Sequence, residues 1–152
     1  MIEEKLLELG LHLPTVAKPL AAYVPALRVG NLVMTSGQVP IVDGVIKYKG
    51  KLGKDITEED GKKAAEICAL NCLAAIKSIT GDLDKINRVV KLVVFVASAE
   101  GFVNQPEVAN GASELIGKIF GESGRHTRSA VGVSELPKGS SVEIEMTVEL
   151  KG

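Results

Sequence analysis

Residues 125–150 read RHTRSAVGVSELPKGSSVEIEMTVEL and contain the most regular pattern of the chain. Within residues 142–150, apolar side chains alternate with glutamates and a threonine, which predicts a β-strand with one buried and one polar face. The apolar segment 128–136 precedes it and is joined to it by PKGS, so we expect a second strand there. Arg128 begins the first strand and Glu143 the second. These two charges are either a structural ion pair across neighbouring strands or the two ends of a small polar site.

The rest of the chain predicts further strands and two main helices. One helix begins at Thr57, which is followed by acidic residues typical of a first turn, and runs to about Ile79. The other covers residues 106–120, where Gly111 and Gly117 weaken the helix and indicate close packing. The remaining expected elements are a short helix at 3–9, an extended segment at 11–27, two short strands around Gly30–Asn31, a small strand at 45–50 and an apolar strand at 86–98. This order predicts an α+β fold, a mixed sheet with helices packed on one face.

Composition limits the classes of function. With 152 residues and 45% hydrophobic content, the chain has enough material for one domain with a core. The 18 basic and 19 acidic side chains nearly cancel, so a general nucleic-acid binder is disfavoured. No run reaches the roughly 20 apolar residues that span a bilayer, and the acidic start has no signal-peptide pattern. We therefore expect a cytoplasmic protein that does not bind membranes.

The cysteines and histidines are too few for a metal cluster. Cys68 and Cys72 lie four residues apart among alanines and leucines, which predicts reduced thiols on the buried face of a helix. The other candidate soft ligands in the sequence are His12 and His126, which are too few and too far apart in sequence for a zinc site, so none is expected. His126 lies beside two arginines and is interpreted as a solvent-facing side chain, with a role in proton transfer as a hypothesis.

The apolar strand at 86–98 indicates an oligomer. Its sequence is apolar on nearly both faces, so each face should be covered by helices or by another subunit. A homo-oligomer is the favoured interpretation. The alternative is a monomer whose helices cover the strand.

Two motifs together carry a resemblance to a known family. NLVMTSGQVP at 31–40 is followed, after a helix and the VVKLVVFVAS strand, by the 128–150 stretch. This order resembles the RidA (YjgF-type) reactive-intermediate deaminase family, formerly called endoribonuclease L-PSP. The resemblance runs from Tyr23 to the C-terminus and implies one domain over 1–152, with residues 1–20 as an N-terminal extension of a longer subfamily. It also implies a chorismate-mutase-like fold and a homotrimer with pockets between neighbouring subunits.

The resemblance also implies an activity and its residues. Members hydrolyse enamines and imines such as 2-aminoacrylate to 2-keto acids and ammonia, with no cofactor and no metal. Arg128 corresponds to the arginine that binds the substrate carboxylate, and Glu143 to the glutamate that positions or activates water. A guanidinium suits the first role because its planar fork of donors matches a carboxylate. The further residues of the expected substrate pocket are Tyr23, Ser36, Gly37 and Asn110.

The sequence departs from the family pattern near these residues. Ala130 stands where many members have a cysteine, so no thiol serves the site. Ala21 and Ala22 replace a Gly-Pro pair ahead of Tyr23, and His126-Thr127 replaces a Pro-Ala pair ahead of Arg128. These departures leave open a non-catalytic trimer that binds small carboxylates or regulates an enzyme. Ribonuclease activity is disfavoured by the neutral charge and scarce histidine, and a chorismate-mutase rearrangement ranks lower still.

Overall fold

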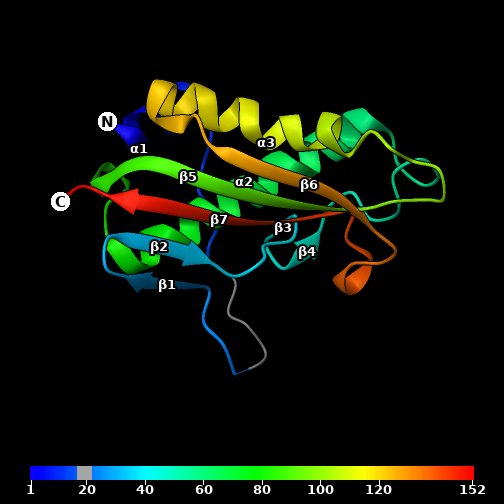
Figure 1. Cartoon of the computed structure of the whole chain (residues 1–152), viewed down its shortest axis with the longest axis horizontal. Helices are drawn as coiled ribbons and strands as arrows, with labels where there is room; N and C mark the ends of the chain where they lie inside the picture. Colours follow the sequence, from blue (N-terminus) through cyan, green and yellow to red (C-terminus); the bar gives the residue numbers. More distant parts are fainter. Residues whose placement is uncertain (17–21) are drawn as a thin grey trace.

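The computed structural model describes residues 1–16 and 22–152 and shows a mixed sheet with helices on one face (Figure 1). Ala21 and part of the expected extended segment lie outside the described residues. The five-stranded sheet has the order β1-β2-β7-β5-β6. Its strands are β1 (Ala26–Val29), β2 (Leu32–Thr35), β5 (Ile86–Ala97), β6 (Thr127–Val133) and β7 (Val142–Leu150). β5 and β6 are parallel and every other neighbouring pair is antiparallel, which confirms the mixed sheet.

Two long helices cover one face of this sheet. α2 (Glu58–Thr80) lies behind the strands in Figure 1, and α3 (Gln105–Phe120) runs beside β6. α2 begins as expected, because the Thr57 hydroxyl accepts a hydrogen bond from the Asp60 N–H at 3.1 Å. The shorter elements are α1 (Ile2–Glu8), the ribbon of β3 (Ile41–Val42) and β4 (Val45–Ile46), and the 3-10 turns η1 (Leu83–Lys85), η2 (Gly121–Gly124) and η3 (Pro137–Gly139). Among the described residues, no helix is long and apolar enough to cross a membrane.

The core lies between the helices and the sheet. Alternate side chains of β7, from Val142 to Leu150, are buried there, as the alternation in the sequence predicts. Cys68 and Cys72 of α2 are fully buried against the same strand, as free thiols. Burial raises the pKa of Cys72 to about 12 and that of Cys68 well above its ordinary value, which disfavours the reactive thiolate form in the folded chain.

The two glycines of α3 differ in their surroundings. A Cβ at Gly111 would lie 2.3 Å from the backbone oxygen of Lys62, so α2 and α3 approach each other closely at this point. At Gly117, a Cβ would meet no atom within 4 Å. The expectation of close packing is therefore correct for Gly111 and wrong for Gly117, which borders an open cavity instead.

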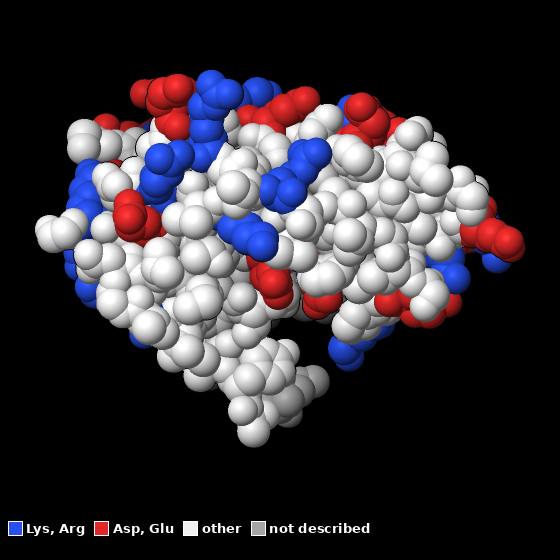
Figure 2. Space-filling model, in the orientation of Figure 1, with Lys and Arg blue, Asp and Glu red and all other residues white. Residues whose placement is uncertain are grey.

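Among the residues that the structure describes, no helix lies on the opposite face of the sheet. Val93 and Phe95 of β5 are only half-buried there, so α2 and α3 do not cover both faces of this strand. Exposed apolar side chains from the neighbouring strands extend this open face: Leu27, Val29, Leu32, Met34 and Val131. Figure 2 shows this side of the molecule as mostly uncharged atoms with a few charged groups between them. The alternative in which helices alone cover both faces of this strand is therefore wrong.

Candidate functional site

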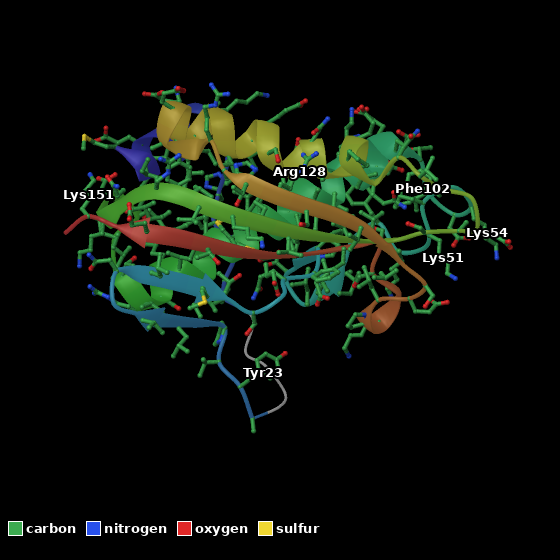
Figure 3. All side chains as sticks on the ribbon, in the orientation of Figure 1. Tyr23, Lys51, Lys54, Phe102, Arg128 and Lys151 are labelled. Atoms are coloured by element: carbon green, nitrogen blue, oxygen red, sulfur yellow. The ribbon has the colours of Figure 1, made fainter. Side chains whose placement is uncertain are left out.

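Arg128 points from β6 toward α3. In the parallel register it pairs with Leu92 of β5, whose side chain is buried on the helix side of the sheet, and paired residues share a face. The Arg128 guanidinium accordingly reaches α3 (Figure 3). Its Nη1 donates to Asn110 Oδ1 at 2.8 Å and to Ser113 Oγ at 3.1 Å. The structure thus brings Asn110 and Arg128 together, and it adds Ser113.

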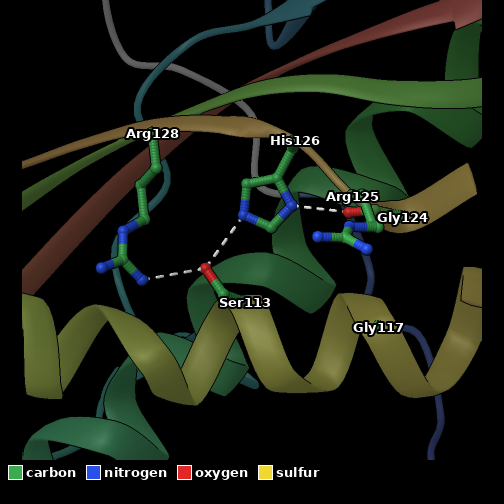
Figure 4. Close-up of a pocket in the computed structure, with 6 residues that line it drawn as sticks. All are labelled: Ser113, Gly117, Gly124, Arg125, His126 and Arg128. Carbon is green, nitrogen blue, oxygen red and sulfur yellow. Dashed lines mark hydrogen bonds between the residues drawn. The ribbon is translucent and has the colours of Figure 1, made fainter. Parts of the chain in front are cut away.

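Ser113 is a partner of Arg128 that the motifs did not predict, although its position in the sequence gave a signal. Ser113 follows Asn110 by three residues, so both lie on one face of the helix. Its hydroxyl lies 2.9 Å from His126 Nε2, and His126 Nδ1 lies 2.6 Å from the Gly124 carbonyl oxygen (Figure 4). His126 is half-buried and held at both nitrogens. The interpretation of this histidine as solvent-facing is wrong, because α3 offers it a hydroxyl partner.

A cavity of about 300 Å³ opens beside these side chains. It is lined by Ser113, Gly117, Gly124, Arg125, His126 and Arg128. Two guanidinium groups face this space, and the two glycines contribute no side chain that would fill it. The cavity therefore has a positively charged lining, and it lies on the side of Arg128 whose Nη1 is held by Ser113.

Glu143 lies on the other face of the sheet. It pairs with Phe95 of β5 and alternates with the fully buried Val142 and Ile144, so it points to the open face. Its carboxyl group packs against the backbone of Gly37, where a Cβ would lie 2.9 Å from both Cδ and Oε1. Burial, and secondarily the charge of Glu145, raise the pKa of Glu143 above its ordinary value. A raised pKa makes a carboxyl group better suited to accepting and returning a proton.

Tyr23 and Ser36 lie near one another beside the β1–β2 hairpin. They share the lining of a cavity of about 390 Å³ with residues of both strands. The Ser36 hydroxyl donates to the Val24 carbonyl oxygen at 2.6 Å and so fixes the segment that carries Tyr23. The Tyr23 side chain itself is 56% exposed, and Figure 3 places it at the edge of the molecule. It is free to contact a ligand or another chain.

The predicted site residues therefore form two separate groups. Arg128 and Asn110 lie between β6 and α3, whereas Glu143 and Gly37 lie on the open face of the sheet. No ion pair joins Arg128 to Glu143 or Glu145 in the part of the chain that the structure describes. The alternative of a structural ion pair is wrong, and a single chain does not hold the whole predicted site. The described residues also contain no group of three or more side chains arranged to hold a metal ion.

Comparisons with known proteins agree with this architecture. Protein TCP17 of Trypanosoma cruzi is 45% identical over 150 residues, which cover 98% of this chain and 94% of that protein. The crystal structure of Atu1372 from Agrobacterium tumefaciens, a protein of unknown function, is 48% identical with a TM-score of 0.92, covering 99% of this chain and 92% of that one. The 2-iminobutanoate/2-iminopropanoate deaminase of Dermatophagoides farinae is 29% identical over 138 residues, covering 91% of this chain and 93% of that protein.

A family match spans almost the whole sequence. Residues 3–150 match the family described as "YjgF/chorismate mutase-like, putative endoribonuclease". The motifs at 31–40 and 128–150 fall within this match, and so does every residue of the two groups described above. The chain belongs to this YjgF family, the RidA family, and has its chorismate-mutase-like α+β fold.

Proposed function

We propose that this protein is a hydrolytic deaminase of 2-imino acids and their enamine tautomers, with active sites between the subunits of a homotrimer. The products are a 2-keto acid and ammonia. Arg128 binds the substrate carboxylate, and Glu143 of a neighbouring copy positions the attacking water. The family and the relative named a 2-iminobutanoate/2-iminopropanoate deaminase support this reaction class.

The observation that carries the proposal is the state of the Arg128 guanidinium. Nη1 has two hydrogens, and both are engaged by Asn110 and Ser113. Among the described residues, the side-chain hydrogen bonds of Arg128 involve Nη1 only, so Nη2 and Nε remain for a ligand. These two nitrogens form one edge of the guanidinium, with two parallel N–H groups that match a carboxylate. Arg128 is therefore fixed on one side and open for a carboxylate on the other.

The reaction needs little more than orientation and a proton path. An enamine first takes a proton on carbon and becomes an iminium ion, which is the protonated form of the imine. Water then adds to the imine carbon, and loss of ammonia from the resulting carbinolamine leaves the keto acid; in sum, one water is consumed per ammonia released. Glu143 can accept a proton from the water and return it to the leaving nitrogen, which its raised pKa favours. The protein contributes by holding the imine and the water together.

Assembly would unite the two groups of residues. Each chain exposes apolar side chains on the open face of its sheet, next to the Glu143 carboxyl group. A second copy on this face would bury those side chains, which stabilises the assembly. Arg128 of one copy and Glu143 of the next would then border one pocket. Tyr23, Ser36 and Gly37 would contribute from the Glu143 side, and Asn110 from the Arg128 side.

The first experiment measures keto-acid release from imino acids generated in place by an amino-acid oxidase. We expect the wild type to accelerate release and Arg128→Ala to lose the acceleration. Arg128→Lys should also fail, since an ammonium cannot offer two parallel donors. His12→Gln serves as the control, because His12 is exposed and lines neither the Arg128 cavity nor the Tyr23 cavity. A folded wild type without turnover, but stabilised by keto acids, would favour the non-catalytic carboxylate binder instead.

The second experiment tests whether two subunits share each site. Arg128→Ala and Glu143→Gln are each expected to be inactive alone. In mixed trimers refolded from equal amounts, about one site in four would combine a wild-type Arg128 with a wild-type Glu143 of the neighbour, so about a quarter of the activity should return. If both residues act within one chain, mixing restores nothing and the shared site is refuted.

A further inference from the structure

Arg128 stands at one end of a chain of hydrogen bonds that runs through Ser113 to His126. The Ser113 hydroxyl accepts from Arg128 Nη1, since a guanidinium has donors only. Its own proton is thus available to a different acceptor. The nearest one is His126 Nε2, at 2.9 Å from Ser113 Oγ (Figure 4).

The other nitrogen of His126 fixes which tautomer is present. Nδ1 lies 2.6 Å from the carbonyl oxygen of Gly124, and a carbonyl oxygen can only accept. Nδ1 therefore carries the ring proton, and Nε2 of the neutral ring is an acceptor. Every polar atom in the chain of bonds then has a consistent role, from Arg128 N–H to Ser113 O–H to His126 Nε2.

The far end of this hydrogen-bond chain, the Gly124 carbonyl group, lies against α3. A Cβ at Gly124 would lie 2.7 Å from the backbone oxygen of Ile116, so the Gly124 backbone lies directly against this helix. The carbonyl group that holds His126 is fixed by the same helix that carries Ser113 and Asn110. The imidazole is consequently held at both nitrogens by rigid partners.

We propose that Ser113 and His126 are positioning residues for Arg128, which act by keeping its Nε and Nη2 edge turned toward the substrate carboxylate. This inference rests on the proposed function, since it assigns the anchor of the same carboxylate-binding group. His126 draws the proton of Ser113 away from Arg128 and leaves an oxygen lone pair directed at Nη1. Without His126, the hydroxyl could turn its proton toward the guanidinium, and Nη1 would lose one of its two acceptors.

Steady-state kinetics on imino acids, with keto-acid binding measured by calorimetry, test the positioning role. Ser113→Ala should raise KM and the keto-acid Kd on the order of tenfold, as expected for loss of a hydrogen bond to a charged group, while kcat stays within about twofold. His126→Phe should act in the same direction. Ser113→Thr keeps the hydroxyl and His126→Gln keeps an acceptor, so both should restore binding to within about threefold of the wild type. Ser78→Ala is the control, because this hydroxyl only donates to the Ala75 carbonyl oxygen.

A merely structural role would give a different pattern. If Ser113→Ala lowered the melting temperature but left KM and Kd unchanged, the positioning role would be refuted. The same holds if His126→Gln behaved like His126→Phe. A fall in kcat alone would also refute it, since an anchor for the ground-state carboxylate acts on binding.

Nitrogen NMR of the imidazole tests the hydrogen-bond chain without any activity. The sequence has two histidines, so His12→Gln leaves His126 as the one imidazole. We expect the signature of a ring protonated at Nδ1, and a shift of the Nε2 resonance in Ser113→Ala. A ring protonated at Nε2 would overturn the inference. A wild type that neither turns over imino acids nor binds keto acids refutes the proposed function, and the NMR result still decides the hydrogen-bond chain.

Discussion

Gly111→Ala and Gly117→Ala should change the stability of the protein in opposite directions. Both positions lie in α3 with ordinary helical backbone, so each alanine gains about 1 kcal/mol of helix propensity. At Gly111 the new Cβ would lie 2.3 Å from the Lys62 oxygen, and a backbone atom cannot move aside as a flexible side chain does. α2 and α3 must separate, and overpacking of this kind costs about 3 kcal/mol. The net expectation is a loss of about 2 kcal/mol for Gly111→Ala and a gain of about 1 kcal/mol for Gly117→Ala.

Thermal unfolding at equal protein concentration measures this difference. For a chain of this length, about 1 kcal/mol corresponds to a shift of roughly 2–4 °C. Gly111→Ala should therefore melt about 4–8 °C below the wild type, and Gly117→Ala about 2–4 °C above it. Equal concentrations matter, because the proposed assembly would contribute to the apparent stability. If Gly111→Ala were as stable as the wild type, the close approach of the two helices would be refuted.

Three further predictions concern the Glu143 side and the core. Glu143→Gln should lower kcat by about a hundredfold and remove the acidic limb of the pH–rate profile. In the wild type, activity should rise with pH as Glu143 loses its proton. Because the pKa of Glu143 is raised, this limb should lie above the ordinary value of 4.5. Gly37→Ala should displace the Glu143 carboxyl group by about half an ångström and lower kcat about tenfold. The melting temperature should change little, because the new Cβ would meet the end of a flexible side chain that can move aside. Cys68 and Cys72 should not react with a thiol reagent at pH 8 until urea unfolds the protein, since burial raises both pKa values; rapid labelling of the folded protein would contradict this.

Much of the fold could be predicted from local patterns. The cap at Thr57, the end of α2 close to Ile79 and the alternation along β7 each depend on a few neighbouring residues, and the structure confirms all three. The faces of β6 could not be predicted in this way. By hydrophobicity alone, Val131 and Val133 would enter the core, yet they point to the open face. At its first residue, α3 lies so close to β6 that only a small residue fits beneath it: a Cβ at Gly132 would be 2.7 Å from Gln105 Nε2.

The faces of the strands also explain why the residues of the candidate site could be predicted one by one, whereas their separation into two groups could not. Arg128 pairs with Leu92 and Glu143 with Phe95, and these two residues of β5 are three positions apart. Since side chains alternate along a strand, an odd separation places Arg128 and Glu143 on opposite faces. Strand register decides this outcome, and no short motif encodes it. The resemblance to the family predicted Arg128 and Glu143 as site residues. Only the strand register shows that they lie on opposite faces of the sheet.

The separation of the two groups and the apolar open face have one explanation in common. In a single chain that held Arg128 beside Glu143, the two charges would form an ion pair. The guanidinium would then have no free pair of N–H donors for a substrate carboxylate. Here Asn110 and Ser113 orient Arg128 without neutralising it, since their oxygens carry no formal charge. Glu143 in turn lies on a face whose apolar side chains favour contact with another copy. Placing the arginine and the glutamate on opposite faces thus keeps each available until assembly, and links the proposed catalytic site to the burial that would hold the oligomer together.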